Sequence, residues 1–302
     1  MTTNSRSNGL RDTVSSLPAA WTAASAEIVE RMEEPILPEL LVRALGILTS
    51  FEYCVLFVYR DRANPIHVYD TFVSPSAKAG LINYVKNTYV LNPFYNAYRR
   101  DLKTGAYRIR DLAPDGFFES EYFKKYKVSV TSSEEIGYLT EGWPPGREEL
   151  CIAIEMPIGE CAEITLSRKT VNGGFSADDI ARLALAVPFL AAVFRRHWRQ
   201  ARFGHLANSG QDSSADDTLQ TFGGSLLSPR EREIAQLLLR GHSTLSISLH
   251  LKISATTVKT HRKNLYIKLG ISTQFELFSL FLGSLRDTST SGRMVTGRSP
   301  KP

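Results

Sequence analysis

Four polar side chains between residues 256 and 263 have the types and spacing needed to hydrogen-bond with the edges of DNA bases. Thr256, Lys259, Thr260 and Lys263 recur at intervals of three and four residues, which places them on one face of a helix. Lysine donates to the O6 and N7 atoms of guanine, and threonine offers a hydroxyl and a methyl group. The pattern therefore predicts a helix that reads the major groove.

The opposite side of this helix is apolar. Val258, Leu265 and Leu269 form a stripe that predicts a core-facing side, and His261 lies beside it. Basic residues at the edges of the polar face are placed for contact with phosphates. The residues expected to contact DNA are Thr244, Thr256, Thr257, Lys259, Thr260, Arg262, Lys263 and Lys268, with Lys252 as a further edge cation.

Helix boundary signals divide residues 227–282 into four short helices. The expected N-caps are Ser228, Ser243, Ser254 and Ser272, and the expected glycine stops are Gly241 and Gly270. At the first cap, Pro229 fits the first helical position and Glu231 completes a capping box. Lys252 and Ile253 alone separate the second helix from the third cap. Two helices joined this closely predict a helix-turn-helix.

The net charge of the chain is located in the same segment. The whole chain carries 36 Lys and Arg against 31 Asp and Glu, a formal charge of +5. Residues 225–285 carry eight basic and three acidic residues, which is also +5, so the remaining residues balance. A basic surface attracts nucleic-acid phosphates. A merely solvated helix face would explain the charge alone, but it would not explain the caps and the tight turn.

The segment resembles the helix-turn-helix domain of the LuxR/GerE family of bacterial transcription regulators, over about one fifth of the chain. The matching residues are the run LSPRERE at 227–233, Gly241, Ile247, Leu251, the pair Ile253 and Ser254, the run TVKTH at 257–261, Asn264, and the run KLG at 268–270. The resemblance implies that the third helix enters the major groove. It also implies that Lys259, Thr260 and Lys263 face bases.

Two residues at the start of the second helix depart from the family pattern. Leu245 stands where a lysine is usual, which removes one expected phosphate contact. Ser246 stands where a glutamate is usual, which weakens the pairing with the cap Ser243. Ser248 keeps a small side chain where two helices cross, so we expect the fold itself to be retained.

The length and composition indicate a soluble protein of two domains. The chain has 302 residues, of which 43% are hydrophobic, an ordinary value for globular proteins. We expect a disordered N-terminus (1–24), a GAF/PAS-like sensor and dimerisation domain (25–202), a linker (203–224), a LuxR-type DNA-binding domain (225–285) and a flexible tail (286–302).

No segment predicts export or membrane insertion. Residues 1–24 lack the apolar core of a signal peptide, and the longest apolar run, 183–194, is too short to cross a bilayer. Cys54, Cys151 and Cys161 are widely spaced within or beside apolar runs, which indicates buried free thiols in a reducing compartment. These features favour a cytoplasmic location.

The N-terminal domain alternates helices and strands. Helices are expected over 39–49, 75–89 and 119–126 and from 92–93 onward, and strands over 53–59, 66–72, 107–109, 135–140, 150–156 and 161–167. A turn at 60–65 predicts that the first two strands form a hairpin. This order indicates an α+β fold, an antiparallel sheet with flanking helices, like that of GAF and PAS sensors.

Two N-terminal partners are common in the LuxR family. A phospho-receiver would need acidic residues at strand ends, and pairs such as Glu134 and Glu135 do not follow a buried apolar strand. Residues 84–95 resemble the middle of an acyl-homoserine-lactone-binding domain. In that position Asn92 replaces the aspartate of an Asp-Pro pair, and the preceding tryptophan is missing. The segment is more similar to LuxR-type regulators whose sensor has no assigned ligand.

Ten aromatic residues lie between Tyr89 and Tyr126. We expect most of them in a core between the sheet and the helices. The alternative is a pocket for a small-molecule effector, with tyrosine hydroxyls orienting the ligand. The candidate pocket residues are Asn92, Phe94, Tyr95, Tyr98 and Tyr122.

A helix is predicted from Ala177 to about Arg202, with Ser176 and Asp179 as its capping box and a kink at Pro188. Its last turns carry Arg195, Arg196, His197, Arg199 and Arg202. These cations complement the helix dipole. A second interpretation is a dimer helix, because a two-fold dimer would set the spacing of two DNA half-sites.

No catalytic, cofactor or metal site is expected. The six histidines do not pair with other ligands at metal-binding spacing, and no nucleophile elbow, phosphate loop or dinucleotide motif occurs. Two functions remain. The first is a homodimeric regulator that binds promoter DNA and, as an activator, contacts RNA polymerase. The second is an adaptor with a degenerate helix-turn-helix, for which Leu245 is the only indication.

Overall fold

The computed structural model describes residues 17–120, 146–207 and 214–291. Its N-terminal part contains a five-stranded antiparallel sheet with strand order β2-β1-β5-β4-β3. The strands are β1 (Tyr53–Arg60), β2 (Ala63–Asp70), β3 (Gly105–Arg108), β4 (Arg147–Glu155) and β5 (Glu160–Lys169). The predicted antiparallel α+β fold is therefore confirmed. The strand expected at 135–140 and nearly all of the helix expected at 119–126 lie outside the described residues.

The first two strands form the predicted hairpin, although β2 begins three residues earlier than expected. Ala63 already pairs with Arg60, and Pro65 lies inside the strand. β2 is an edge strand, so the missing N–H of Pro65 need not remove a ladder hydrogen bond.

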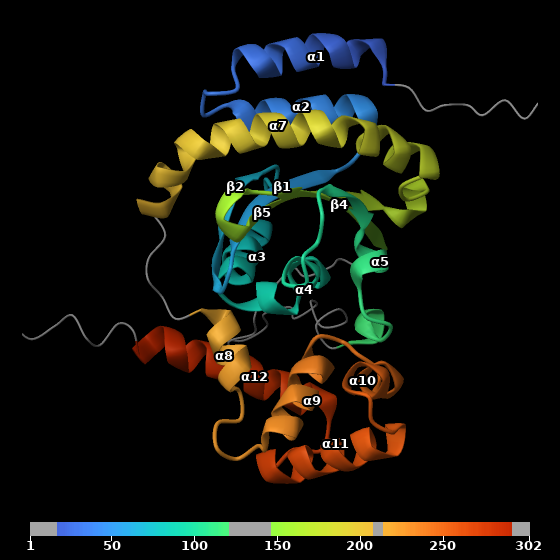
Figure 1. Cartoon of the computed structure of the whole chain (residues 1–302), viewed down its shortest axis with the longest axis vertical. Coiled ribbons are helices and arrows are strands. Elements are labelled where there is room, and N and C mark those ends of the chain that lie inside the picture. The colour runs from blue at the N-terminus through green and yellow to red at the C-terminus, as the bar shows by residue number, and fades with distance from the viewer. Residues whose placement is uncertain (1–16, 121–145, 208–213, 292–302) are drawn as a thin grey trace, which may run out of the picture.

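Helices cover both faces of the sheet (Figure 1). On one face lie α1 (Ala19–Glu30), α2 (Leu37–Leu48) and α7 (Ala177–Ala207), and on the other lie α3 (Pro75–Asn83), α4 (Pro93–Tyr98) and α5 (Ile109–Leu112). Short helical turns lie between these elements at Tyr84–Thr88 (η1), Tyr89–Leu91 (η2), Phe117–Glu119 (η3), Pro157–Gly159 (η4) and Thr170–Asn172 (η5). Of these, η4 connects β4 to β5, and η5 connects β5 to α7. The single helix predicted over 75–89 thus changes to a π-helical turn at Tyr84.

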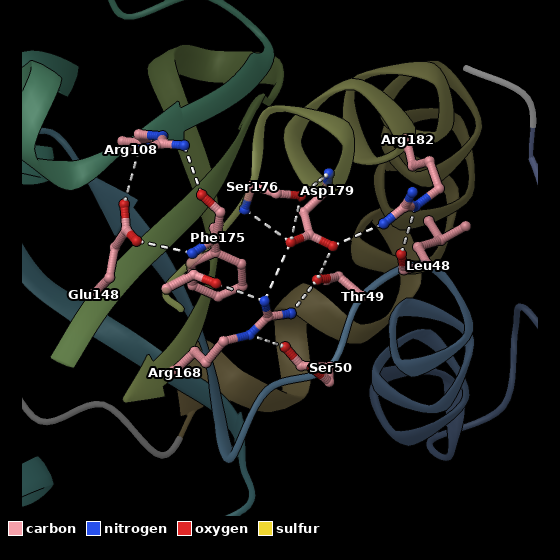
Figure 2. Close-up of polar contacts among 11 residues, drawn as sticks. Leu48, Thr49, Ser50, Arg108, Glu148, Arg168, Phe175, Ser176, Asp179 and Arg182 are labelled. Carbon is pink, nitrogen blue, oxygen red and sulfur yellow. Dashed lines mark hydrogen bonds and ion pairs between the residues drawn. The ribbon is translucent and has the colours of Figure 1, made fainter. Parts of the chain in front are cut away.

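A buried polar network joins the start of α7 to the sheet and to the end of α2 (Figure 2). Ser176 and Asp179 form the predicted capping box, with Asp179 N–H donating to Ser176 Oγ over 3.1 Å. The guanidinium of Arg168 reaches Asp179 Oδ2 at 3.1 Å and the Thr49 hydroxyl at 2.6 Å. Burial would raise the pKa of Asp179, but these hydrogen bonds and Arg168 lower it. The network fixes three elements that are distant in the sequence.

Two segments that were expected to lack helices, the N-terminus and the linker, contain them. Residues 1–24 were expected to be disordered, yet α1 begins at Ala19 and Trp21 is buried. Residues 203–224 were expected to be a linker, yet α7 continues to Ala207 and a further helix, α8 (Ala215–Thr221), follows. Local composition missed α8 because its stability comes from burial of Leu219 and the following Phe222 against other elements.

The cations near the end of α7 contact neighbouring elements of the same chain. Arg195 donates to the Glu155 carbonyl over 2.7 Å, and Arg196 pairs with Glu33 at 2.6 Å. Arg202 reaches Glu160 at 3.0 Å. Pro188 lies inside a helix that stays continuous across it. These residues therefore hold α7 on the sheet and on the segment between α1 and α2.

The C-terminal part contains the four predicted helices: α9 (Pro229–Leu239), α10 (Thr244–Leu251), α11 (Ala255–Leu269) and α12 (Gln274–Ser291). Ser228, Ser243 and Ser254 cap the first three as expected. The expected cap at Ser272 is wrong by one position, because the Thr273 hydroxyl accepts the N–H of Glu276. α12 also extends into the segment expected to be a flexible tail.

One apolar core joins the two parts. The cluster that includes Tyr89 and Phe94 of the N-terminal part continues through Leu219 of α8 to Ile234 and Phe281. Figure 1 shows α8 to α12 beyond the face of the sheet that α4 covers. Within the described ranges, no helix has the length and apolar character needed to span a membrane.

Candidate nucleic-acid interface

The turn between α10 and α11 is built from local hydrogen bonds. Lys252 adopts a left-handed conformation with φ 53° and ψ 45°, which allows the Ile253 N–H to reach the Ser248 carbonyl at 3.0 Å. Ser254 then caps α11 by accepting the Thr257 N–H at 3.0 Å. A non-glycine residue in this conformation costs about 1 kcal/mol, which the closed turn offsets. The helix-turn-helix geometry follows from these contacts.

One side of α11 holds the helix in the domain. Val258 and Leu265 are fully buried, together with Ile234 of α9 and Ile247 of α10. Leu269 and His261 are half-buried, as the predicted apolar stripe requires. A helix fixed along this side must present its other side outward.

The predicted base-contacting residues lie on that outward side. Thr256, Lys259, Thr260 and Lys263 are all exposed. Lys259 and Lys263 form no ion pair with any residue that the structure describes. The Thr260 hydroxyl donates its proton to the Thr256 carbonyl over 3.1 Å, which leaves the methyl group and the acceptor capacity of the hydroxyl oxygen free. Two unpaired ammonium groups and a threonine methyl thus share one surface.

The other residues predicted to contact DNA differ in how exposed they are and in whether they have partners within the domain. Thr244, Thr257 and Arg262 are half-buried, and the Thr257 hydroxyl lies 2.7 Å from Ser254 Oγ. Lys268 is engaged within the domain, because its ammonium lies 2.6 Å from the carboxylate of Glu231. Its role as a phosphate contact therefore competes with a structural one.

Apolar residues also face solvent around the helix-turn-helix. Leu245 and Leu249, one turn apart on α10, are 62% and 72% exposed, and Ile267 of α11 is 67% exposed. The exposure of Leu245 agrees with the usual lysine at this position, since either side chain would point outward.

The candidate effector residues of the sensor are mostly part of an aromatic core. Asn92 caps α4 by accepting the Phe94 N–H at 2.7 Å. Phe94 and Tyr95 are fully buried, and the Tyr98 hydroxyl donates to the Gly159 carbonyl at 2.6 Å. Tyr122 lies outside the described residues. Asn92 therefore uses within the fold the side-chain oxygen that an effector pocket would need.

Sequence reasoning missed a buried carboxyl beneath these aromatic rings. Glu163 of β5 accepts a hydrogen bond from the Tyr59 hydroxyl at 2.7 Å and another from Thr165 at 2.8 Å. Burial raises the pKa of Glu163, and burial together with this carboxylate raises the pKa of Tyr59. The signal was available: Glu163 and Thr165 alternate with apolar residues in β5, which places both on one face of the sheet.

A cavity of about 470 Å³ lies elsewhere, between β3 and α7, and the candidate effector residues do not line it. Its walls include Thr104, Ala106, Val187, Pro188 and Arg195. Within the described ranges, no three His, Cys, Asp or Glu side chains converge as metal ligands would. The three cysteines are buried free thiols.

Comparison with known proteins matches residues 225–281 to a family described as bacterial regulatory proteins, luxR family. A protein of Aeromonas salmonicida described as "Putative HTH-type transcriptional regulator in exeN 3′region" is 30% identical over 200 residues, covering 64% of this chain and 94% of that protein. The transcriptional regulatory protein MctR of Rhizobium johnstonii is 49% identical over 51 residues, 17% of this chain and 24% of its own.

Two solved structures of regulators resemble the fold of this chain, with TM-scores below 0.5. The LBD domain of VqsR from Pseudomonas aeruginosa has a TM-score of 0.47 at 17% identity and covers 61% of this chain and 98% of its own. SdiA of Escherichia coli has a TM-score of 0.36 at 15% identity and covers 88% of this chain and 99% of its own.

Proposed function

Because the chain belongs to the luxR family of bacterial regulatory proteins and is a LuxR-type transcription regulator, we propose that α11 lies in the major groove of its operator. The observation that carries this proposal is the division of α11 into two sides. Val258 and Leu265 are fully buried, whereas Lys259 and Lys263 are exposed and unpaired among the described residues. A helix of this kind can present donors to guanine without leaving its domain.

The side chains have different roles in this proposal. Lys259 and Lys263 donate to base edges, and the Thr260 methyl packs on a thymine methyl. Thr256, in the first turn of α11, shares the face that meets the bases. Thr257, in the same turn, and Thr244, at the start of α10, face the DNA backbone. Arg262 contacts phosphate from the edge of the face.

In this proposal the sensor domain controls DNA binding and forms the two-fold symmetric dimer. We assign to it the gating of DNA binding by a small-molecule effector, held near the aromatic layer of Phe94, Tyr95 and Tyr98 around Tyr59. A homodimer would bind two half-sites, and an activator would add a contact with RNA polymerase. The protein acts in this scheme by binding, without catalysis.

Footprinting on the DNA upstream of the protein's own gene and its neighbours tests the proposal. The full-length chain is compared with Lys259→Ala and Lys263→Ala, and with Lys86→Ala, an exposed lysine of the sensor, as the matched control. We expect the α11 substitutions to reduce the preference for the protected sequence by about 1–3 kcal/mol. If all four proteins bind every duplex alike, the groove assignment is wrong and the adaptor function is favoured.

A further inference from the structure

The sensor domain contacts the first helix of the helix-turn-helix through one carboxylate. Asp115, which directly precedes Gly116 at the start of η3, accepts hydrogen bonds from the Ser243 N–H at 3.1 Å and the Ser243 hydroxyl at 2.5 Å. Ser243 is the N-cap of α10, and its oxygen also accepts the Ser246 N–H at 3.1 Å. The carboxylate of Asp115 therefore lies at the positive end of the α10 dipole.

Asp115 is held there as an anion. Partial burial would raise its pKa, but hydrogen bonds from Ser243 and from the Gly116 N–H lower it. Among the residues that the structure describes, Asp115 has no ion pair. Its described hydrogen-bond donors are Ser243 and the N–H of Gly116. The neighbouring His242 also favours the charged form of Asp115.

The two backbones meet beside this contact. A Cβ atom built on Gly116 would lie 2.8 Å from the Gly241 carbonyl oxygen and 3.2 Å from the Ser243 nitrogen. Gly116 itself has φ −97° and ψ 7°, a conformation that other residues also adopt. Glycine is therefore required at position 116 by the contact between domains and not by its own backbone.

The same donors have a second use in a DNA complex. The first helix of a helix-turn-helix crosses the DNA backbone, and helix N-termini donate to phosphate oxygens. We propose that Asp115 is a built-in substitute for a DNA phosphate, so that the sensor docked at Ser243 and a phosphate at the start of α10 exclude one another. This inference rests on the proposed function, because it assumes that α10 approaches DNA.

The base-reading face of α11 stays uncovered in the docked arrangement. Lys259, Thr260 and Lys263 are exposed while Asp115 is bound to Ser243. Docking therefore reduces affinity for the backbone and leaves the choice of bases unchanged. A sensor that acted by covering α11 would instead alter both.

Fluorescence anisotropy of the full-length protein tests this with two labelled duplexes of about 30 base pairs, one of random sequence and one from the footprinted region. Asp115→Asn removes the charge, and Gly116→Ala keeps the charge but adds a methyl group against Gly241. We expect each to raise affinity for both duplexes by about three- to tenfold, with an unchanged ratio between them. Asp111→Asn, which removes the same charge from an exposed position in α5, is the control and should change affinity less than twofold.

The outcomes separate this inference from the proposed function. If Asp115→Asn and Gly116→Ala bind like the parent protein while Lys259→Ala and Lys263→Ala weaken or relax binding, the phosphate-substitute inference is overturned and the proposed function stands. If the lysine substitutions also have no effect, the proposed function fails.

Hydrogen exchange in the unsubstituted protein tests the same inference without relying on variants that could fail to fold. In the parent protein, saturating random-sequence duplex should speed amide exchange in residues 113–118, because the DNA displaces this segment from α10. Unchanged or slower exchange in that segment would overturn the inference.

Discussion

The ammonium of Lys268 lies 2.6 Å from the carboxylate of Glu231, which ties the end of α11 to the start of α9. The same carboxylate accepts the Ser228 N–H at 2.8 Å as part of the capping box. Its side chain is 5% exposed and that of Lys268 is 42% exposed. The helix that we propose to face DNA is thus fixed by an ion pair with a helix cap.

Removing this ammonium should destabilise the protein. We expect Lys268→Ala to cost about 1–2 kcal/mol, because Glu231 would remain buried without its partner, while the half-exposed lysine limits the loss. Thermal unfolding of the variant measures the cost. Lys263→Ala, an exposed lysine of the same helix, is the control and should unfold like the parent protein.

The ion pair between Lys268 and Glu231 also predicts that the folded protein loses stability at low pH. The hydrogen-bonded ion pair with Lys268 and the capping bonds lower the pKa of Glu231 to about 2. Since the pKa is lower in the folded state, the stabilisation is complete above the ordinary pKa near 4.5 and is lost as the pH falls toward 2. Unfolding of Glu231→Gln should depend less on pH across this interval than unfolding of the parent, and equal dependence would contradict the assignment.

Arg262 should contribute to binding without contributing to sequence choice. It lies at the edge of the α11 face, where phosphate is its expected partner. We expect Arg262→Ala to weaken binding to all duplexes alike and to reduce the slope of log affinity against log salt concentration by about one. Titrations of specific and random duplexes at several salt concentrations measure both effects. A change confined to the specific duplex would assign Arg262 to base reading instead.

The Arg168–Asp179 network should be a major source of stability in the sensor domain. Asp179→Asn leaves the guanidinium of Arg168 buried without its counter-charge, and we expect a loss of about 2–4 kcal/mol. The neighbouring Asp178 is exposed in the same first turn of α7, so Asp178→Asn is the matched control. Chemical denaturation that gives equal stabilities for the two variants would show that the buried pair contributes nothing.

His242 should make the protein sensitive to mild acid. Burial, with His250, Arg100 and Arg240 opposing its charge and Asp115 favouring it, lowers the pKa of His242 to about 4. Because His242 stays neutral in the folded state, the protein loses stability as the pH falls from about 6.5 toward 4. We expect a loss of about 1 kcal/mol between pH 7 and pH 5, after allowance for partial exposure. His242→Gln should flatten this dependence, whereas His261→Gln should not.

The parts of the fold set by neighbouring residues could be predicted from the sequence. Ser228, Ser243 and Ser254 each cap a helix by accepting the N–H of the residue three positions later. The helical period of α11 places Val258 and Lys259 on different sides without reference to the rest of the chain. At the last cap the sequence offers two hydroxyls in succession, Ser272 and Thr273, and local rules do not choose between them.

Features that depend on distant residues could not be predicted in this way. α8 has a polar, acidic sequence and is held by burial of Leu219 and the adjacent Phe222. Asp115 and Ser243 are 128 positions apart and lie in loops without periodicity. Glu163 is an intermediate case. Its alternation with apolar residues predicts the face of the sheet on which it lies, but it does not predict that the Tyr59 hydroxyl is its partner.

The contact between Asp115 and Ser243 has a further consequence because both residues belong to one chain. Joined partners meet at an effective concentration in the millimolar range, so a contact whose dissociation constant lies below that range is occupied most of the time. DNA in the cell competes against that local concentration, which does not change with the amount of protein. In the proposed scheme of a homodimer with a docked sensor, dimerisation and DNA set the response of the regulator to its own abundance, whereas docking contributes a constant factor.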